Sequence, residues 1–185
     1  MGAALAHQLI RGEHSLTVWN RSAQKMQPFI DLSANGADSI VEAITASPSI
    51  IICVSNYADT YSMLDDAEIK NSLQNRIVVQ LSTGTPLDAV EAENWFQQYG
   101  AKYIDGAILG GPGNLDTDVA KVVFSGPESV YATVQPQLCS LCANTLYLGD
   151  NIRAASALDL AWLCRHYGMF LGITHGVVLC ESEAP

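Results

Sequence analysis

Two basic residues directly follow a short apolar stretch in the segment SLTVWNRSAQK (15–25). Arg21 and Lys25 are two of only nine lysines and arginines, and no acidic residue lies between them. If Ser22 begins a helix, both side chains lie on neighbouring turns of one face, where cations are unfavourable unless an anion joins them. The spacing therefore predicts an anion site to which Asn20 and Ser22 add hydrogen bonds; the alternative is a solvated basic helix start.

Small polar residues follow two other apolar stretches, in CVSN (53–56) and LSTGTP (81–86). Short hydroxyls, amides and free backbone groups let a ligand approach the chain closely. We expect the following residues to line a ligand: Val54, Ser55, Asn56, Ser82 and Thr83. The alternative is that these are ordinary loop residues.

Strand-like and helix-like apolar patterns alternate along the chain. Gly12 is expected to end the first helix in a left-handed conformation, and Ser39 with Glu42 forms a capping-box pattern. The run 49–55 is expected to be a strand buried on both faces. The expected helices are 3–11, 22–32, one opening at Ser39, 59–73, 86–99, 128–142 and 152–181. The expected strands are 15–19, 49–55, 76–82, 102–109, 121–126 and 144–149.

This alternation is typical of an α/β fold with a Rossmann-type, doubly wound and mostly parallel sheet. Ligands of such sheets lie outside the carboxyl ends of the strands. An arginine at the end of the second strand, in place of an acid, favours the 2′-phosphate of NADP over the bare ribose of NAD. We therefore expect NADP, with its 2′-phosphate held by Asn20, Arg21, Ser22 and Lys25.

Both ends of the chain have their own patterns. Met1-Gly2 leads directly into a helix, as if Gly2 were the third glycine of a G-x-G-x-x-G turn after a missing first strand. After Gly149 the pattern becomes one helix of about 30 residues, long enough to leave the sheet. We expect 1–149 to be an NADP-binding domain and 150–185 to begin a helix toward a helical domain. Without those parts, the isolated chain is expected to have negligible activity.

The assembled segments resemble the NADP-dependent imine reductases and reductive aminases of the β-hydroxyacid dehydrogenase superfamily, which includes 6-phosphogluconate dehydrogenase. The resemblance implies a Rossmann domain, a long interdomain helix and a helical domain exchanged between two subunits. It further implies an oxidoreductase that reduces C=N bonds with NADPH. The segments that carry it are 1–25, IIICVSN (50–56), VVQLSTGTP (78–86), GAKYIDGAILGGPG (100–113), VVFSGPES (122–129), LYLGD (146–150) and ASALDLAWLCRHYGMFLGITHGVVLCES (155–182).

By this resemblance, Asp159 occupies a position that is lysine in the alcohol-oxidising dehydrogenases and aspartate or tyrosine in imine reductases. Imine reduction proceeds through a cationic iminium that a carboxylate stabilises, whereas alcohol oxidation needs a base and a cation. On spacing alone, an exposed acid in the first turns of a helix explains Asp159 better. The resemblance also implies substrate-site roles for Tyr167 and Thr83, and cofactor contacts from Gly2.

Two alternatives stay open. One is a 3-hydroxyacid dehydrogenase-like oxidoreductase, against which the absence of lysine at 159 argues. The other is a truncated, non-catalytic module that binds a nucleotide or a partner.

Composition limits the partners of the chain. A net charge of −10 and a pI near 4.6 argue against binding nucleic acid or an anionic membrane. Cys139 and Cys142 are expected to pack in the core from an amphipathic helix rather than to bind a metal. We expect the cysteines of the chain to be reduced thiols, which favours a cytoplasmic location. We expect an imine, or a carbonyl compound and an amine, as substrate, and a homodimer formed through the apolar long helix.

Overall fold

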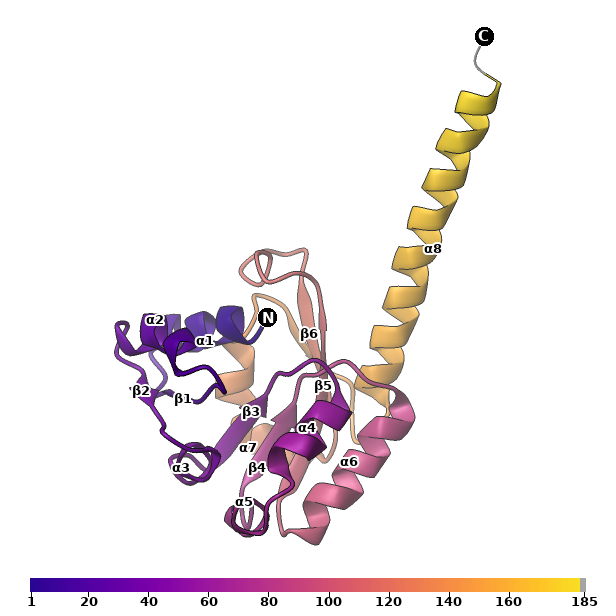
Figure 1. Ribbon diagram of the computed structural model, residues 1–185. Coiled ribbons are helices and arrows are strands. Elements are labelled where there is room, and N and C mark those ends of the chain that lie inside the picture. Colours follow the sequence, from indigo (N-terminus) through magenta and orange to yellow (C-terminus); the bar gives the residue numbers. More distant parts are fainter. Residues whose placement is uncertain (184–185) are drawn as a thin grey trace.

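The computed structural model describes residues 1–183, which form a layered α/β fold with one long projecting helix (Figure 1). The central sheet has the strand order β3-β4-β5-β6-β7, and only the β5–β6 pair within it is antiparallel. The Rossmann-type, mostly parallel sheet expected from the sequence is therefore confirmed. Its strands are β3 (Ser49–Ile52), β4 (Ile77–Gln80), β5 (Lys102–Leu109), β6 (Lys121–Ser125) and β7 (Thr145–Tyr147).

Helices cover both faces of this sheet. One face packs against α1 (Gly2–Arg11) and α7 (Glu128–Cys139), with Phe124 and Leu138 in the shared core. The other face packs against α3 (Ile40–Thr45), α4 (Tyr57–Leu64), α5 (Ala67–Ser72) and α6 (Pro86–Gln98). Side chains of β4 and β5 alternate between these cores, so Val78 and Tyr103 face the second one.

The N-terminal quarter forms a small separate sheet of β1 (Thr17–Val18) and β2 (Asn35–Gly36). The expected helix 22–32 is wrong: Ala23–Lys25 is a 3₁₀ turn, and α2 spans only Gln27–Ile30. Pro28 lacks an N–H and fits only the first turn of a helix, so it breaks the longer one. The expectation that 49–55 is buried on both faces is also wrong, because β3 is an edge strand and mostly half-buried.

Other local expectations are confirmed in part. Ser39 accepts a hydrogen bond from the Glu42 backbone N–H, but the Glu42 carboxylate accepts from Asp38 instead of closing the box on Ser39. Gly12 is not left-handed, since its φ is −79°, and Glu13 takes the positive φ of 58°.

Two other expected helices are shorter than predicted. The segment 59–73 divides into α4 and α5, because the carboxylate of Asp66 accepts from the backbone N–H groups of Glu68 and Ile69 and starts a new helix. Helix α7 ends at Cys139, which is exposed, whereas Cys142 lies beyond the helix in the core. Core packing is therefore right for Cys142 and wrong for Cys139.

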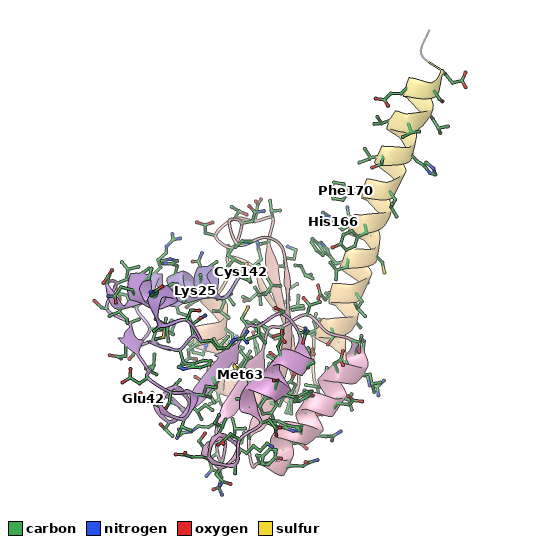
Figure 2. All side chains as sticks on the ribbon, in the orientation of Figure 1. Lys25, Glu42, Met63, Cys142, His166 and Phe170 are labelled. Atoms are coloured by element: carbon green, nitrogen blue, oxygen red, sulfur yellow. The ribbon has the colours of Figure 1, made fainter. Side chains whose placement is uncertain are left out.

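Helix α8 (Ala154–Ser182) begins on the sheet and then leaves it. Its first turns pack on β5 and β6, where Ala155 contacts the cluster of Ala107, Leu109 and Val123. Beyond them, Figure 2 shows the side chains of His166 and Phe170 away from the helices that flank the sheet. Across residues 1–183, no helix combines the length and the apolar character needed to cross a bilayer.

Candidate functional site

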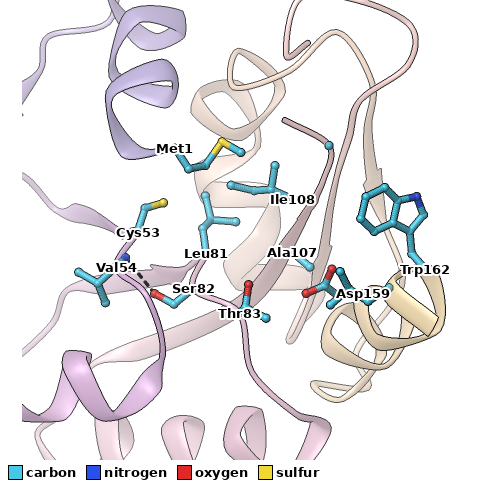
Figure 3. A pocket seen from close by; sticks show the side chains of 12 residues that line it. Met1, Cys53, Val54, Leu81, Ser82, Thr83, Ala107, Ile108, Asp159 and Trp162 are labelled. Atoms are coloured by element: carbon cyan, nitrogen blue, oxygen red, sulfur yellow. Dashed lines mark hydrogen bonds between the residues drawn. The ribbon is translucent and has the colours of Figure 1, made fainter. Parts of the chain in front are cut away.

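A cavity of about 260 Å³ lies at the carboxyl ends of β3 and β4, between the sheet and α8 (Figure 3). The expected residues Val54, Ser82, Thr83 and Asp159 all line it. Trp162 lines it as well, although it was not predicted from the sequence to lie at this site. It follows Asp159 by three residues, which places it on the same face of α8, and that spacing is the signal that identifies it.

Asp159 is on the buried side of α8. It is only 6% exposed, and Ala155 and Ser156 are the other buried residues of the helix. The explanation of Asp159 as an exposed helix-start acid is therefore wrong. Burial raises the pKa of its carboxyl. The carboxyl accepts no hydrogen bond from the described residues, and it faces the Thr83 hydroxyl across the cavity (Figure 3). It is thus available to a ligand.

The loop after β4 is tied to the loop after β3. The Ser82 hydroxyl accepts a hydrogen bond from the Val54 backbone N–H at 3.0 Å and donates one to Oε1 of buried Gln80. Nε2 of Gln80 donates to the Thr60 hydroxyl in α4 at 2.9 Å. Ser82 therefore sets the shape of both loops, and its side chain is engaged with the protein rather than free for a ligand.

Ser55 and Asn56 lie on the exposed turn that leads into α4 and are not lining residues of either cavity. The Asn56 side chain accepts a hydrogen bond from the Asp59 backbone N–H at 2.8 Å, so it caps α4. The sequence pattern of small polar residues is thus explained partly by helix capping.

A buried carboxyl group lies beside this site, and it was not predicted from the sequence. Asp105 is fully buried in β5, opposite Gln80 in the strand register. Its Oδ1 accepts from the hydroxyls of Tyr57 and Tyr103, and its Oδ2 accepts from the Ser156 hydroxyl. Burial raises the pKa of Asp105 to about 6, and these hydrogen bonds oppose the rise.

A second cavity, of about 860 Å³, lies between α1, β1 and β3. Asn20, Arg21, Ser22 and Lys25 all line it and are exposed. The structure therefore gathers the predicted phosphate-binding residues, although not by the expected route, because Arg21 precedes the 3₁₀ turn and the two cations share no helix. The Asn20 side chain accepts a hydrogen bond from the Ser22 backbone N–H at 3.0 Å. Neither cation forms an ion pair within residues 1–183.

The two cavities share Cys53 and Val54 in their linings. Gly2, the first residue of α1, lies at this junction, and a Cβ there would come within 3.6 Å of the Cys53 carbonyl oxygen. A ligand that reaches from Arg21 to Asp159 would therefore pass beside Gly2 and the end of β3.

Tyr167 is not brought to the site. Its side chain is 62% exposed on the projecting part of α8 and contributes to neither cavity. Within the described residues, no group of three His, Cys, Asp or Glu side chains is placed to hold a metal ion.

Residues 1–149 match the family model of the NAD binding domain of 6-phosphogluconate dehydrogenase. The chain belongs to this family. It is 33% identical to the NADPH-dependent reductive aminase of Aspergillus oryzae over 183 residues, which cover 98% of this chain and 61% of that protein.

Two solved structures are also similar. The imine reductase of Myxococcus stipitatus in complex with NADP⁺ is 31% identical, with a TM-score of 0.92 over 99% of this chain and 63% of that one. The reductive aminase of Aspergillus terreus in complex with NADPH4, cyclohexanone and allyl amine is 34% identical, with a TM-score of 0.87 over 100% of this chain and 64% of that one. The chain thus spans 61% to 64% of the length of these relatives.

Proposed function

We propose that this chain is the cofactor-binding part of an NADPH-dependent oxidoreductase that reduces C=N bonds, with an imine, or a ketone and an amine, as substrate. The observation that carries the proposal is the buried Asp159 carboxyl, which faces Thr83 in a cavity at the carboxyl ends of the strands. The similar imine reductase and reductive aminases support the same reading. Residues 1–149 would form the cofactor-binding domain, and 150–185 would begin the connection to the rest of the enzyme.

The residues present fit an extended dinucleotide. Arg21 and Lys25 would hold the 2′-phosphate in the larger cavity, helped by Asn20 and Ser22. Gly2 lines the larger cavity beside Cys53, where the cavities join, and would lie next to the middle of the ligand. The reduced cofactor would supply a hydride at the smaller cavity, beside Val54 and the Ser82–Thr83 loop. Among residues 1–183, no acidic side chain lines the large cavity to compete for Arg21 and Lys25.

The chain's own chemistry at the reacting end comes from Asp159. As a carboxylate it stabilises the positive charge of an iminium group and orients a substrate amine. Because burial raises the pKa of Asp159, this group also holds a proton more readily than an ordinary aspartate does. The Thr83 hydroxyl can donate to, or accept from, a substrate held between the two side chains.

A second copy of the chain would cover the projecting part of α8. Without a partner, the apolar side chains exposed there would remain in water, and burying them between two helices would stabilise the pair. They are Met169, Phe170, Leu171, Ile173, Val177, Val178 and Leu179.

The five cysteines form no disulfide within the described residues, which agrees with a reducing, cytoplasmic setting.

Cofactor titration tests the proposal directly. We expect NADPH to bind the chain more tightly than NADH, measured by nicotinamide fluorescence. Arg21→Ala should weaken NADPH binding about ten- to a hundredfold, the scale for loss of a charge-assisted contact, and leave NADH binding unchanged. Lys102→Ala serves as the control, since it removes a cation at the first residue of β5, at the opposite edge of the sheet from the carboxyl ends where the cofactor would bind. Equal affinities for the two cofactors in the parent chain would contradict the proposal.

A further inference from the structure

The three hydroxyl groups that bind Asp105 come from three different elements. Tyr57 is the first residue of α4 and directly follows the turn at Asn56. Tyr103 lies on β5 itself, and its hydroxyl is 3.1 Å from Oδ1. Ser156 lies in the first turn of α8, and its hydroxyl is 2.5 Å from Oδ2. One buried carboxyl group therefore joins the sheet to α4, which follows the Val54 loop, and to α8, whose first turns line the smaller cavity.

A carboxylate suits this junction because its two oxygens accept several hydrogen bonds in two directions and donate none. Burying the carboxylate without these hydrogen-bond partners would cost roughly several kcal/mol. Packing alone does not require such a group, since apolar residues fill the neighbouring positions Ala107 and Leu109 on the same face of β5. The position of Asp105 between α4 and α8 points instead to a role in orienting them.

Helix α8 has two anchors to the sheet at its start. The Ser125 hydroxyl accepts from the Ala155 backbone N–H at 3.1 Å and donates to the Ile152 carbonyl oxygen at 3.0 Å. That contact fixes where the helix begins. The bond from Ser156 to Asp105 lies off the helix axis, so it restrains how the helix is turned about that axis, together with the packing of Ala155 and Trp162 on the sheet.

Asp159 follows Ser156 by three residues and lies on the same face of α8. Its carboxyl has no hydrogen bond to residues 1–183 that would hold it independently. Its place in the cavity therefore depends on the rotation of α8.

We propose that Asp105 is a positioning residue: through Ser156 it sets the rotation of α8 and so holds the Asp159 carboxyl in the cavity, facing Thr83. Asp105 does not line the cavity, so it would act there only through the elements that it holds. The catalytic meaning of this arrangement rests on the proposed function, but the coupling between Ser156 and Asp159 does not.

Ser156→Ala tests the coupling without changing any charge. With the hydroxyl removed, α8 can turn, Asp159 gains contact with water, and its pKa falls toward that of an ordinary aspartate. The pKa is read from ¹³C-carboxyl NMR titration of the folded chain. Ser156→Thr keeps a hydroxyl and should restore the parent titration. Thr133→Ala, which removes an exposed hydroxyl on α7, should leave it unchanged.

A role in stability alone would lower the free energy of unfolding but would leave the pKa of Asp159 in the folded chain as it is. An unchanged Asp159 titration in folded Ser156→Ala therefore overturns the proposal. If that variant does not fold, Ser156→Cys replaces it, and its weak S–H donor should give Asp159 a pKa below the parent's. A titration identical to the parent's would again overturn the proposal. NADPH titration of the same samples separates the two proposals. Failure to bind NADPH refutes the proposed function, whereas a lowered pKa of Asp159 in Ser156→Ala still supports the positioning role.

Discussion

Replacing Asp105 with asparagine should change how the stability of the chain depends on pH. In the folded chain, burial raises the pKa of Asp105 from 3.8 to about 6. A difference of about two units corresponds to about 3 kcal/mol, at about 1.36 kcal/mol per unit. This is the largest effect on stability that a proton at Asp105 can have.

The sign follows from which state holds the proton. Between pH 3.8 and about 6, the folded chain binds the Asp105 proton and the unfolded chain has lost it. The stabilisation is therefore fully present below the unfolded pKa, is lost as the pH rises through the folded pKa, and stays lost above it. Asparagine carries no such proton. Its amide oxygen can accept from Tyr57 and Tyr103, and its NH₂ group can donate to Ser156, so the three contacts persist.

Urea unfolding followed by tryptophan fluorescence, from about pH 4 to about pH 8, measures this difference. We expect the parent to lose up to about 3 kcal/mol more than Asp105→Asn over this range. Other titrating groups contribute alike to both proteins, so the difference belongs to Asp105. Asp118→Asn, in the exposed loop after β5, controls for the loss of one carboxyl group. Parallel curves for parent and Asp105→Asn would refute the reasoning.

Three further predictions concern the reaction, the loop after β4 and assembly. In a protein that includes the helical domain and reduces a cyclic imine, Asp159→Ala should lower kcat about 10²-fold and leave the Kd of NADPH unchanged. Unchanged turnover would exclude a catalytic role for Asp159. Gly84→Ala should lower the free energy of unfolding in urea by about 1–3 kcal/mol, because a Cβ there would lie 2.3 Å from the Tyr57 ring. Gly111→Ala is the control: a Cβ at that position has nothing within 4 Å, so stability should not change. Sedimentation at micromolar concentration should show a dimer that Leu171→Glu converts to monomer, and a monomeric parent would contradict the assembly.

The sequence predicted elements best where local signals agree. Helix α6 begins at Pro86 as expected, because Thr85 and Asp88 form a complete capping box around a proline that favours the first turn. Strand β5 has the expected bounds, 102–109. Apolar spacing failed where a side chain acts on the backbone locally, as Asp66 does between α4 and α5.

The site was predictable where its residues directly follow strands of the parallel sheet. Val54, Ser82 and Thr83 follow strands, so their meeting at one edge of the sheet follows from parallel strand order. The role of Asp105 is different: its donors Tyr57 and Ser156 lie 48 and 51 residues away. The strand KYIDGAIL shows one acid in an apolar run, and no local pattern says which distant hydroxyls reach it.

The two ends of the proposed ligand site are held in different ways. At the reacting end, Gln80 and Asp105 are cross-strand partners on one face of the sheet, and each is buried among hydroxyls from the surrounding elements. These bonds fix the Ser82 loop, the start of α4 and the first turn of α8 from a rigid base, which is the preorganisation that charge stabilisation requires. At the phosphate end, Arg21 and Lys25 stand on exposed short turns, and among residues 1–183 their side chains form no hydrogen bond. Their geometry would be completed by the ligand, so changes there should alter affinity and cofactor choice, whereas changes beneath Asp159 should alter the chemistry.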